Sequence, residues 1–126
     1  MPDNFFAGLD FGTSGARISI INFENELVYS NSVPYQCSFK NPNSWINSCE
    51  KLLDSIPTEV KSNLDKLAIS GTSGTLTAFN LKGEPLGEAI PYDQACNDYK
   101  ILIKSLASGE DHLQTPYGSL AKALKL

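Results

Sequence analysis

The segment DFGTSGAR, residues 10–17, gathers glycines and hydroxyl side chains into one short stretch. Gly12 and Gly15 allow the backbone to turn tightly and to approach a bound ligand closely. Successive N–H groups in such a turn can point into one concavity and bind the oxygens of a phosphate group. Thr13 and Ser14 add hydroxyl donors at the same place. The spacing therefore predicts a phosphate-binding turn.

Two charged residues flank this turn. Asp10 alone would repel a phosphate, so its position suits a phosphate site only if a cation lies between the two. Mg²⁺ fits, because it is usually held through water by carboxylates together with the phosphates of a substrate. Arg17 supplies a fixed positive charge. Neither the P-loop nor the dinucleotide fingerprint matches, since no lysine follows the turn and a strand is expected after it. A plain hairpin with Asp10 as a turn residue is the alternative.

A second turn of similar composition, SGTSGT at residues 70–75, follows the apolar stretch LAI. Thr72, Ser73 and Gly74 combine hydroxyls with permissive backbone, and such hydroxyls can hydrogen-bond a phosphate or the hydroxyls of a sugar. If the strands before the two turns are parallel neighbours, both turns open at one edge of the sheet, where open sheets bind ligands. The alternative is a tight turn with surface serines.

The surrounding sequence predicts a mixed α/β fold. Alternation and β-branched residues indicate strands at 6–12, 16–23 and 27–34, which are spaced for an antiparallel meander. Helical spacing follows at 41–56, and a buried strand comes after it at 66–70. A strand that returns after a helix favours parallel addition beside the first strand. This order resembles the opening of the ribonuclease H-like fold, which actin, hexokinase and the Hsp70 ATPases share.

The remainder of the chain predicts smaller elements. These are a short helix at 58–64, a strand at 75–80, a turn at 81–85 and a helix that begins at 117. Apolar residues at helical spacing from Ala95 to Leu106 predict a further helix, and Gly109 is a plausible residue to end it.

The composition sets limits on the class of protein. With 126 residues, 41% hydrophobic and 19% charged, the chain has the size and composition of one globular domain. The net charge of -4 argues against binding to nucleic acid or to an anionic membrane. No apolar run is long enough to span a bilayer and the N-terminus lacks the features of a secretory signal, so a cytoplasmic protein is expected.

The cysteines, Cys37, Cys49 and Cys96, form no CxxC pair, and His112 is the single histidine of the sequence. This pattern speaks against a zinc site. It predicts free, mostly buried thiols in a reducing compartment.

Taken together, the motifs resemble the N-terminal part of the FGGY carbohydrate kinases. The first turn is similar to that family's first phosphate motif, D-x-G-T-[ST]-x-x-R, which is matched by Asp10, Gly12, Thr13, Ser14 and Arg17. Residues 67–86 resemble the second block, which is a strand, a substrate-contacting turn and a hairpin. Residues 90–96 resemble the block after it, and 118–126 resemble a later helix. The blocks follow the family's order over nearly the whole chain.

Within the family, SGTSGT is most similar to the D-ribulose kinase type of pentulose kinase of photosynthetic organisms, in a D-ribulose/xylulose kinase-like branch. Xylulose kinases usually carry Gln-Met-His-Gly at this place, and this chain has no histidine there. The resemblance implies transfer of the γ-phosphoryl group of ATP to a hydroxyl of a small sugar, such as D-ribulose, with Mg²⁺ as cofactor.

The resemblance also implies roles for individual residues. Asp10 would position Mg²⁺ through water, and Thr13 with its backbone neighbours would hold the transferring phosphate. The implied ATP-phosphate residues are Asp10, Gly12, Thr13, Ser14, Gly15 and Arg17, and the implied sugar-binding residues are Thr72, Ser73, Gly74 and Asp93. The third block departs from the family pattern, because Asp93-Gln94 stands where Asn-Asp is usual and Cys96 where arginine is usual. An exposed loop without a role is the alternative for Asp93.

Two parts of the family's machinery are expected beyond Leu126: the general-base aspartate of a GxxD motif, and the adenine pocket of a C-terminal domain. Residues 1–126 are thus predicted to be part of a kinase N-terminal domain, inactive in isolation and able to self-associate through an uncovered edge. A stand-alone, non-catalytic module derived from a kinase, which binds phosphate or sugar or acts in regulation, is one alternative, and an unrelated small α/β domain is another. An endogenous protein with a mass near 13.7 kDa would exclude the fragment.

Overall fold

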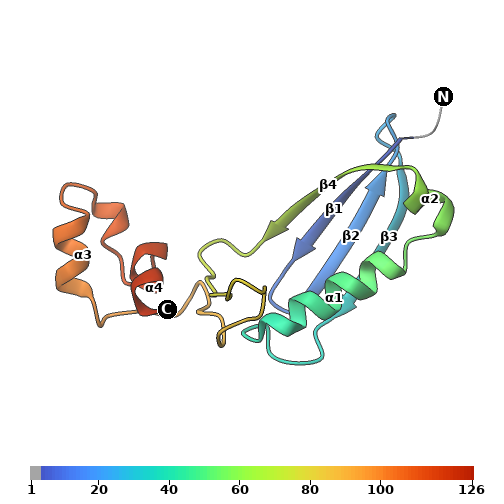
Figure 1. Ribbon diagram of the computed structural model, residues 1–126. Coiled ribbons are helices and arrows are strands. Elements are labelled where there is room, and N and C mark those ends of the chain that lie inside the picture. The colour runs from blue at the N-terminus through green and yellow to red at the C-terminus, as the bar shows by residue number, and fades with distance from the viewer. Residues whose placement is uncertain (1–3) are drawn as a thin grey trace. The chain divides into compact units, whose positions relative to one another are not determined.

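The computed structural model describes residues 4–126, which form two compact units. The first unit holds residues 4–39 and 43–71, and the second holds 40–42 and 72–126. Figure 1 shows the strands of the first unit and the short helices of the second.

A four-stranded mixed sheet forms the first unit, in the order β3-β2-β1-β4. Its strands are β1 (Phe5–Phe11), β2 (Gly15–Ile21), β3 (Leu27–Pro34) and β4 (Leu64–Gly71). The pairs β1–β2 and β2–β3 are antiparallel, and β4 runs parallel to β1. The predicted meander with a parallel fourth strand is therefore confirmed.

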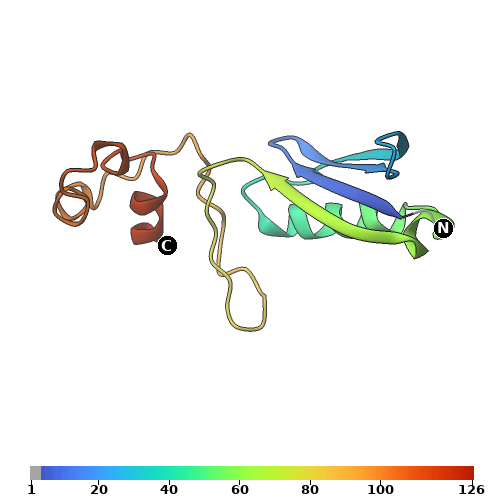
Figure 2. The same ribbon diagram turned by 90° about the horizontal axis from the view of Figure 1, so that it is seen from above.

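One face of this sheet packs against helix α1 (Pro42–Asp54), as Figure 2 shows from above. A short helix, α2 (Thr58–Ser62), leads from α1 into β4. Side chains alternate between the two faces of a strand, so every second residue of β1 and β2 is buried on the α1 side. The buried residues of this core are Ala7, Leu9, Ala16, Ile18, Ile20, Leu52 and Ile56.

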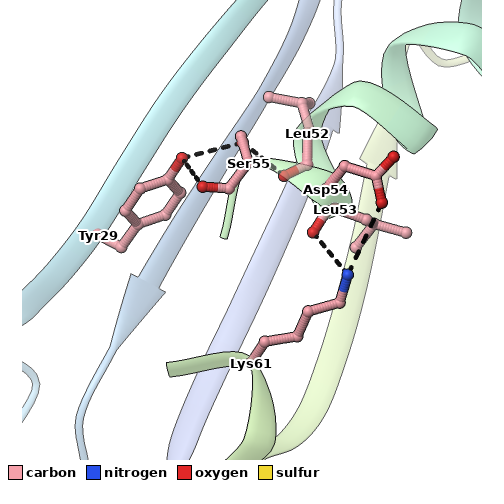
Figure 3. A network of polar contacts seen from close by, with 6 residues as sticks. All are labelled: Tyr29, Leu52, Leu53, Asp54, Ser55 and Lys61. Atoms are coloured by element: carbon pink, nitrogen blue, oxygen red, sulfur yellow. Dashed lines mark hydrogen bonds and ion pairs between the residues drawn. The ribbon is translucent and has the colours of Figure 1, made fainter. Parts of the chain in front are cut away.

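Polar contacts fix the C-terminal end of α1 to its neighbours (Figure 3). The Tyr29 hydroxyl on β3 donates to the Ser55 backbone oxygen at 2.8 Å and lies 2.9 Å from Ser55 Oγ. Ser55 Oγ in turn donates to the Leu52 carbonyl at 2.7 Å. From α2, Lys61 Nζ donates to the Leu53 carbonyl at 3.0 Å. These contacts attach the helix to the strand at the far edge of the sheet and to α2.

The second unit contains α3 (Lys100–Leu106), a turn of 3-10 helix (Asp111–Leu113) and α4 (Ser119–Lys125). Its small core is made of residues from the loop before α3 and from both α-helices. The buried members are Ile90, Cys96, Ile103 and Ala121.

The predicted strand at 75–80 is wrong. Only two isolated bridges form there, between Leu76 and Ile90 and between Phe79 and Pro85. Proline has no N–H to donate, so a ladder cannot continue through Pro85. The predicted turn at 81–85 does form, with Gly83 at φ +80°.

The predicted helix from Ala95 to Leu106 begins later than expected, at Lys100. The Cys96 amide donates to the Pro116 carbonyl at 2.8 Å, a bond to a segment far along the chain. That bond holds the backbone at Cys96 outside the helix, although the apolar spacing is helical.

The cysteines of the described residues are free, as predicted, but only Cys96 is buried. Cys49 is partly exposed and Cys37 is exposed, so the prediction of mostly buried thiols is wrong. Across residues 4–126, no cluster of histidine, cysteine and acidic side chains could hold a metal ion as a group of three or more. None of the helices in the same range is long and apolar enough to cross a membrane.

Candidate phosphate-binding site

Asp10 and Arg17 face each other across the antiparallel pair β1–β2. Asp10 Oδ2 lies 3.2 Å from an Arg17 guanidinium nitrogen, and the two side chains are 48% and 68% exposed. An ion pair as exposed as this contributes only about 0.2–1 kcal/mol to stability. A cation at Asp10 and an anion at Arg17 can therefore replace it at little cost.

The turn between the two strands leaves backbone donors free. The Gly12 amide donates to the Gly15 carbonyl at 2.9 Å, and the Ser14 carbonyl accepts from the Tyr35 amide at 3.0 Å. Thr13 and Ser14 at the tip are exposed, and their own amides donate to no protein acceptor within residues 4–126. Two adjacent free N–H groups beside an arginine are suited to binding a phosphate oxygen.

Gly15 is required for a reason that the sequence did not indicate. Its φ is not positive, so no left-handed conformation demands glycine there. A Cβ at this position would lie 2.5 Å from the Val33 carbonyl oxygen and 3.0 Å from Pro34 Cα on β3. Close approach to the neighbouring strand, and not to a ligand, therefore excludes a side chain.

Tyr35 supports the turn from the residue after β3, and sequence reasoning missed it. Its hydroxyl donates to the Gly12 carbonyl at 3.0 Å, next to the bond from its amide to Ser14. Burial, and to a smaller extent the negative charge of Asp10, raise the pKa of the Tyr35 hydroxyl above its usual value of 10.0. The available signal was the place of Tyr35 directly after the strand paired with β2.

Replacement of Asp10 by asparagine is expected to lower the pKa of Tyr35, because it removes a negative charge that disfavours the phenolate. ¹³C NMR of tyrosine ring carbons over the alkaline range measures this. Since the folded pKa is raised, the contribution of Tyr35 to stability is present below pH 10.0 and falls as the pH rises above it. Asp65→Asn on β4 is the control and leaves this titration unchanged.

A shallow pocket of about 370 Å³ lies beside the turn. Ser14, Arg17 and Ser32 contribute polar groups to its lining, and Ser32 pairs with Arg17 across β2–β3. The surface next to the free amides thus has room for a ligand and carries one hydroxyl donor from the turn and one from β3.

The second predicted turn, residues 70–75, begins at the end of β4. Asp10 pairs with Ser70 and Phe11 with Gly71 in the parallel register, so β1 and β4 end at the same level of the sheet. The two hydroxyl-bearing turns start directly after these strand ends, at Gly12 and at Thr72. The expectation that strands one and four are parallel neighbours is met.

Within the second unit, the turn at residues 72–75 is stabilised by a hydrogen bond between two of its own side chains. Thr72 Oγ1 donates to Thr75 Oγ1 at 3.0 Å, which commits the Thr72 hydroxyl to the turn itself. Gly74 has φ +72°, a conformation that side-chain-bearing residues rarely adopt. Ser73 and Asp93 are exposed. Of the predicted sugar-binding residues, these two present accessible polar side chains.

Lys122 on α4 is a buried cation that sequence reasoning also missed. Its side chain is fully buried, and its Nζ donates to the carbonyls of Gly74 at 2.6 Å and Tyr92 at 3.0 Å. No acidic side chain among residues 4–126 forms an ion pair with it. Removing an ammonium from water costs several kcal/mol, which these charge-assisted bonds must offset. A lysine on a short amphipathic helix normally lies on the solvated face, so the sequence carried no signal for this role.

Comparison with known proteins bears on the fold. No model of a known protein family matches the sequence. A xyloylose kinase from Brucella ovis matches 97% of this chain with a TM-score of 0.78 and 17% identity. A gluconate kinase from Lactobacillus acidophilus gives a TM-score of 0.71 at 15% identity, also over 97% of this chain. A Plasmodium falciparum glycerol kinase, solved with ADP, gives 0.67 at 18% identity over 98% of the chain.

The chain has the fold of sugar-kinase N-terminal domains. That fold is the actin- and hexokinase-like one expected from the sequence, with a mixed sheet flanked by helices. The chain covers 29%, 28% and 28% of the lengths of these three kinases, respectively.

Proposed function

We propose that this chain is the phosphate-binding N-terminal part of an ATP-dependent sugar kinase of the FGGY type. The hairpin turn carries the proposal, because an accessible carboxylate, an arginine and two free amides meet at the end of β1. The shared fold with three sugar kinases supports it. Since the chain covers less than a third of those kinases, the proposal assigns it ligand binding and not the whole reaction.

The donor set of the turn fits Mg²⁺ and a polyphosphate. Magnesium prefers oxygen ligands and keeps much of its water, and the half-exposed Asp10 carboxylate suits such binding through water. When bound, Mg²⁺ neutralises charge on the phosphates. Thr13 and Ser14 donate their amides to phosphate oxygens, and the Thr13 hydroxyl adds a donor. Arg17 leaves Asp10 and pairs with the phosphate. In phosphoryl transfer such positioning and charge neutralisation supply most of the catalysis.

The sugar is assigned to the second unit, and we propose a pentulose such as D-ribulose. Of the residues that the family resemblance implies for sugar binding, Ser73 and Asp93 present accessible polar side chains. A hydroxyl can both donate to and accept from a sugar hydroxyl, and a carboxylate accepts from one. Thr72 and Gly74 contribute by shaping the turn.

Loss of the Ser73 hydroxyl is expected to weaken D-ribulose binding about 2- to 10-fold, the effect of one hydrogen bond between neutral groups. Isothermal titration of Ser73→Ala with D-ribulose measures it, in the presence of Mg²⁺·ADP. Ser62→Ala is the matched control, since Ser62 is exposed on α2 and bonds only to its own helix. D-ribulose binding no tighter than that of glycerol, or equal in the two variants, would contradict the assignment of the sugar site.

A further inference from the structure

We infer that Lys122 is a positioning residue for sugar binding, because its ammonium joins the 72–75 turn to the segment around Tyr92 and Asp93. The inference rests on the proposed function. It adds a residue outside both segments that fixes how their polar side chains are presented. Lys122 belongs to the same compact unit as both segments.

The contacts give the ammonium two anchors that are distant in sequence. Nζ donates to the Gly74 carbonyl at 2.6 Å and to the Tyr92 carbonyl at 3.0 Å. A Cβ on Gly74 would lie 3.8 Å from Nζ and 3.9 Å from Tyr92 Cβ. The three residues therefore meet at one point.

Each anchor is adjacent to a side chain assigned to the sugar. Ser73 precedes Gly74, and Asp93 follows Tyr92. Fixing the Gly74 carbonyl fixes the peptide plane between Gly74 and Thr75. Fixing the Tyr92 carbonyl fixes the peptide that leads into Asp93. Together with the paired backbone bonds between Leu76 and Ile90, Lys122 thus holds the segments that carry Ser73 and Asp93, without touching the sugar itself.

A purely structural role explains the choice of lysine poorly. A methionine of similar length would fill the buried site without placing a charge there, and apolar replacements of buried ions are often neutral or stabilising. The ammonium gains only carbonyl partners among the described residues, with no carboxylate to offset its charge. What lysine adds over methionine is a directed tie between two loops.

Lys122→Met is expected to weaken D-ribulose binding at least about tenfold, the loss typical for a hydrogen bond with a charged donor. Binding of Mg²⁺·ADP is expected to stay within about twofold, since the phosphate turn belongs to the other unit. Both affinities are measured by isothermal titration. Lys125→Met is the matched control, because Lys125 lies on the same helix but is exposed and bonded to Asp98.

Hydrogen exchange tests the tie itself, independently of any ligand. The Leu76 amide donates across to the Ile90 carbonyl, and the Gln94 amide donates to the Pro91 carbonyl within the second segment. In Lys122→Met they are expected to exchange at least about tenfold faster than in the wild type. The amide of Ala107, which donates to the Ile103 carbonyl at the end of α3, should be unchanged in both lysine variants.

Rescue separates positioning from loss of fold. Lys122→Arg keeps charge and donors, so it is expected to bind D-ribulose more tightly than Lys122→Met. Unchanged D-ribulose affinity in Lys122→Met, or no recovery in Lys122→Arg, would overturn the inference. If wild-type protein binds Mg²⁺·ADP but no sugar, the sugar assignment fails instead, whatever the exchange rates show.

Discussion

Asp10→Asn is expected to weaken the binding of Mg²⁺·ATP by about 10- to 100-fold, the range for losing a charge-assisted interaction. The carboxylate is half exposed and engaged only in a weak ion pair with Arg17, so its charge is available to a hydrated cation. Asparagine keeps the size of the side chain but not its charge. Isothermal titration with ATP at fixed Mg²⁺ measures the change.

The same variant should behave in the opposite way without Mg²⁺. A negative Asp10 repels bare ATP, so Asp10→Asn is expected to bind Mg²⁺-free ATP as tightly as the wild type or more tightly. Asp65→Asn, the same charge change on exposed β4, is the control in both titrations. Equal loss with and without Mg²⁺ would show that Asp10 does not act through a cation.

Gly15→Ala is expected to lower the free energy of unfolding by about 1–3 kcal/mol, the usual cost of overpacking. The new Cβ would lie 2.5 Å from the Val33 carbonyl, which belongs to the backbone of β3 and cannot turn away as a flexible side chain could. The strands must separate or the turn must shift. Urea unfolding followed by circular dichroism measures the loss.

Gly8→Ala provides the matched control on the neighbouring strand. No atom lies within 4 Å of a Cβ at this exposed position on β1, so the added methyl group meets nothing. Reduced entropy of the unfolded chain should stabilise this variant by about 0.4–1 kcal/mol. If Gly15→Ala were as stable as Gly8→Ala, close approach between β2 and β3 would not be the reason for glycine at position 15.

Much of the sheet could be predicted because its determinants are local. The predicted strand at 27–34 has the same bounds as β3, and the helix before 66–70 correctly indicated a parallel neighbour for β1. Alternation, β-branched residues and the length of the connection are visible in sequence without knowledge of distant contacts.

The second unit was predicted less well because long-range contacts decide its structure. A bond from Cys96 to Pro116 prevents the helical spacing near Ala95 from forming helix. At 75–80, strand-like residues form only single bridges, since Pro85 interrupts the pairing. The bond from Cys96 reaches a residue far along the chain, whereas Pro85 lies in the turn directly after residues 75–80, and its effect depends on which residue it faces.

Two supporting residues of the candidate site, Tyr35 and Lys122, were missed for the same reason. The sequence indicated the residues at the tips of the turns, such as Thr13 and Ser73, from their types and spacing. Tyr35 and Lys122 act through bonds to backbone carbonyls of distant segments. A carbonyl is present at every position, so residue types give no indication of which ones are bonded.

The central proposal is that the turn at residues 12–15 binds the phosphate groups of a nucleotide through Mg²⁺. The most direct measurement is a ¹H–¹⁵N NMR titration of this chain with Mg²⁺·ADP. The backbone amides of Thr13 and Ser14 are predicted to show the largest shifts, and Asp10→Asn to abolish them at the same concentration. Saturable binding that leaves the chemical shifts of both amides unchanged would contradict the account.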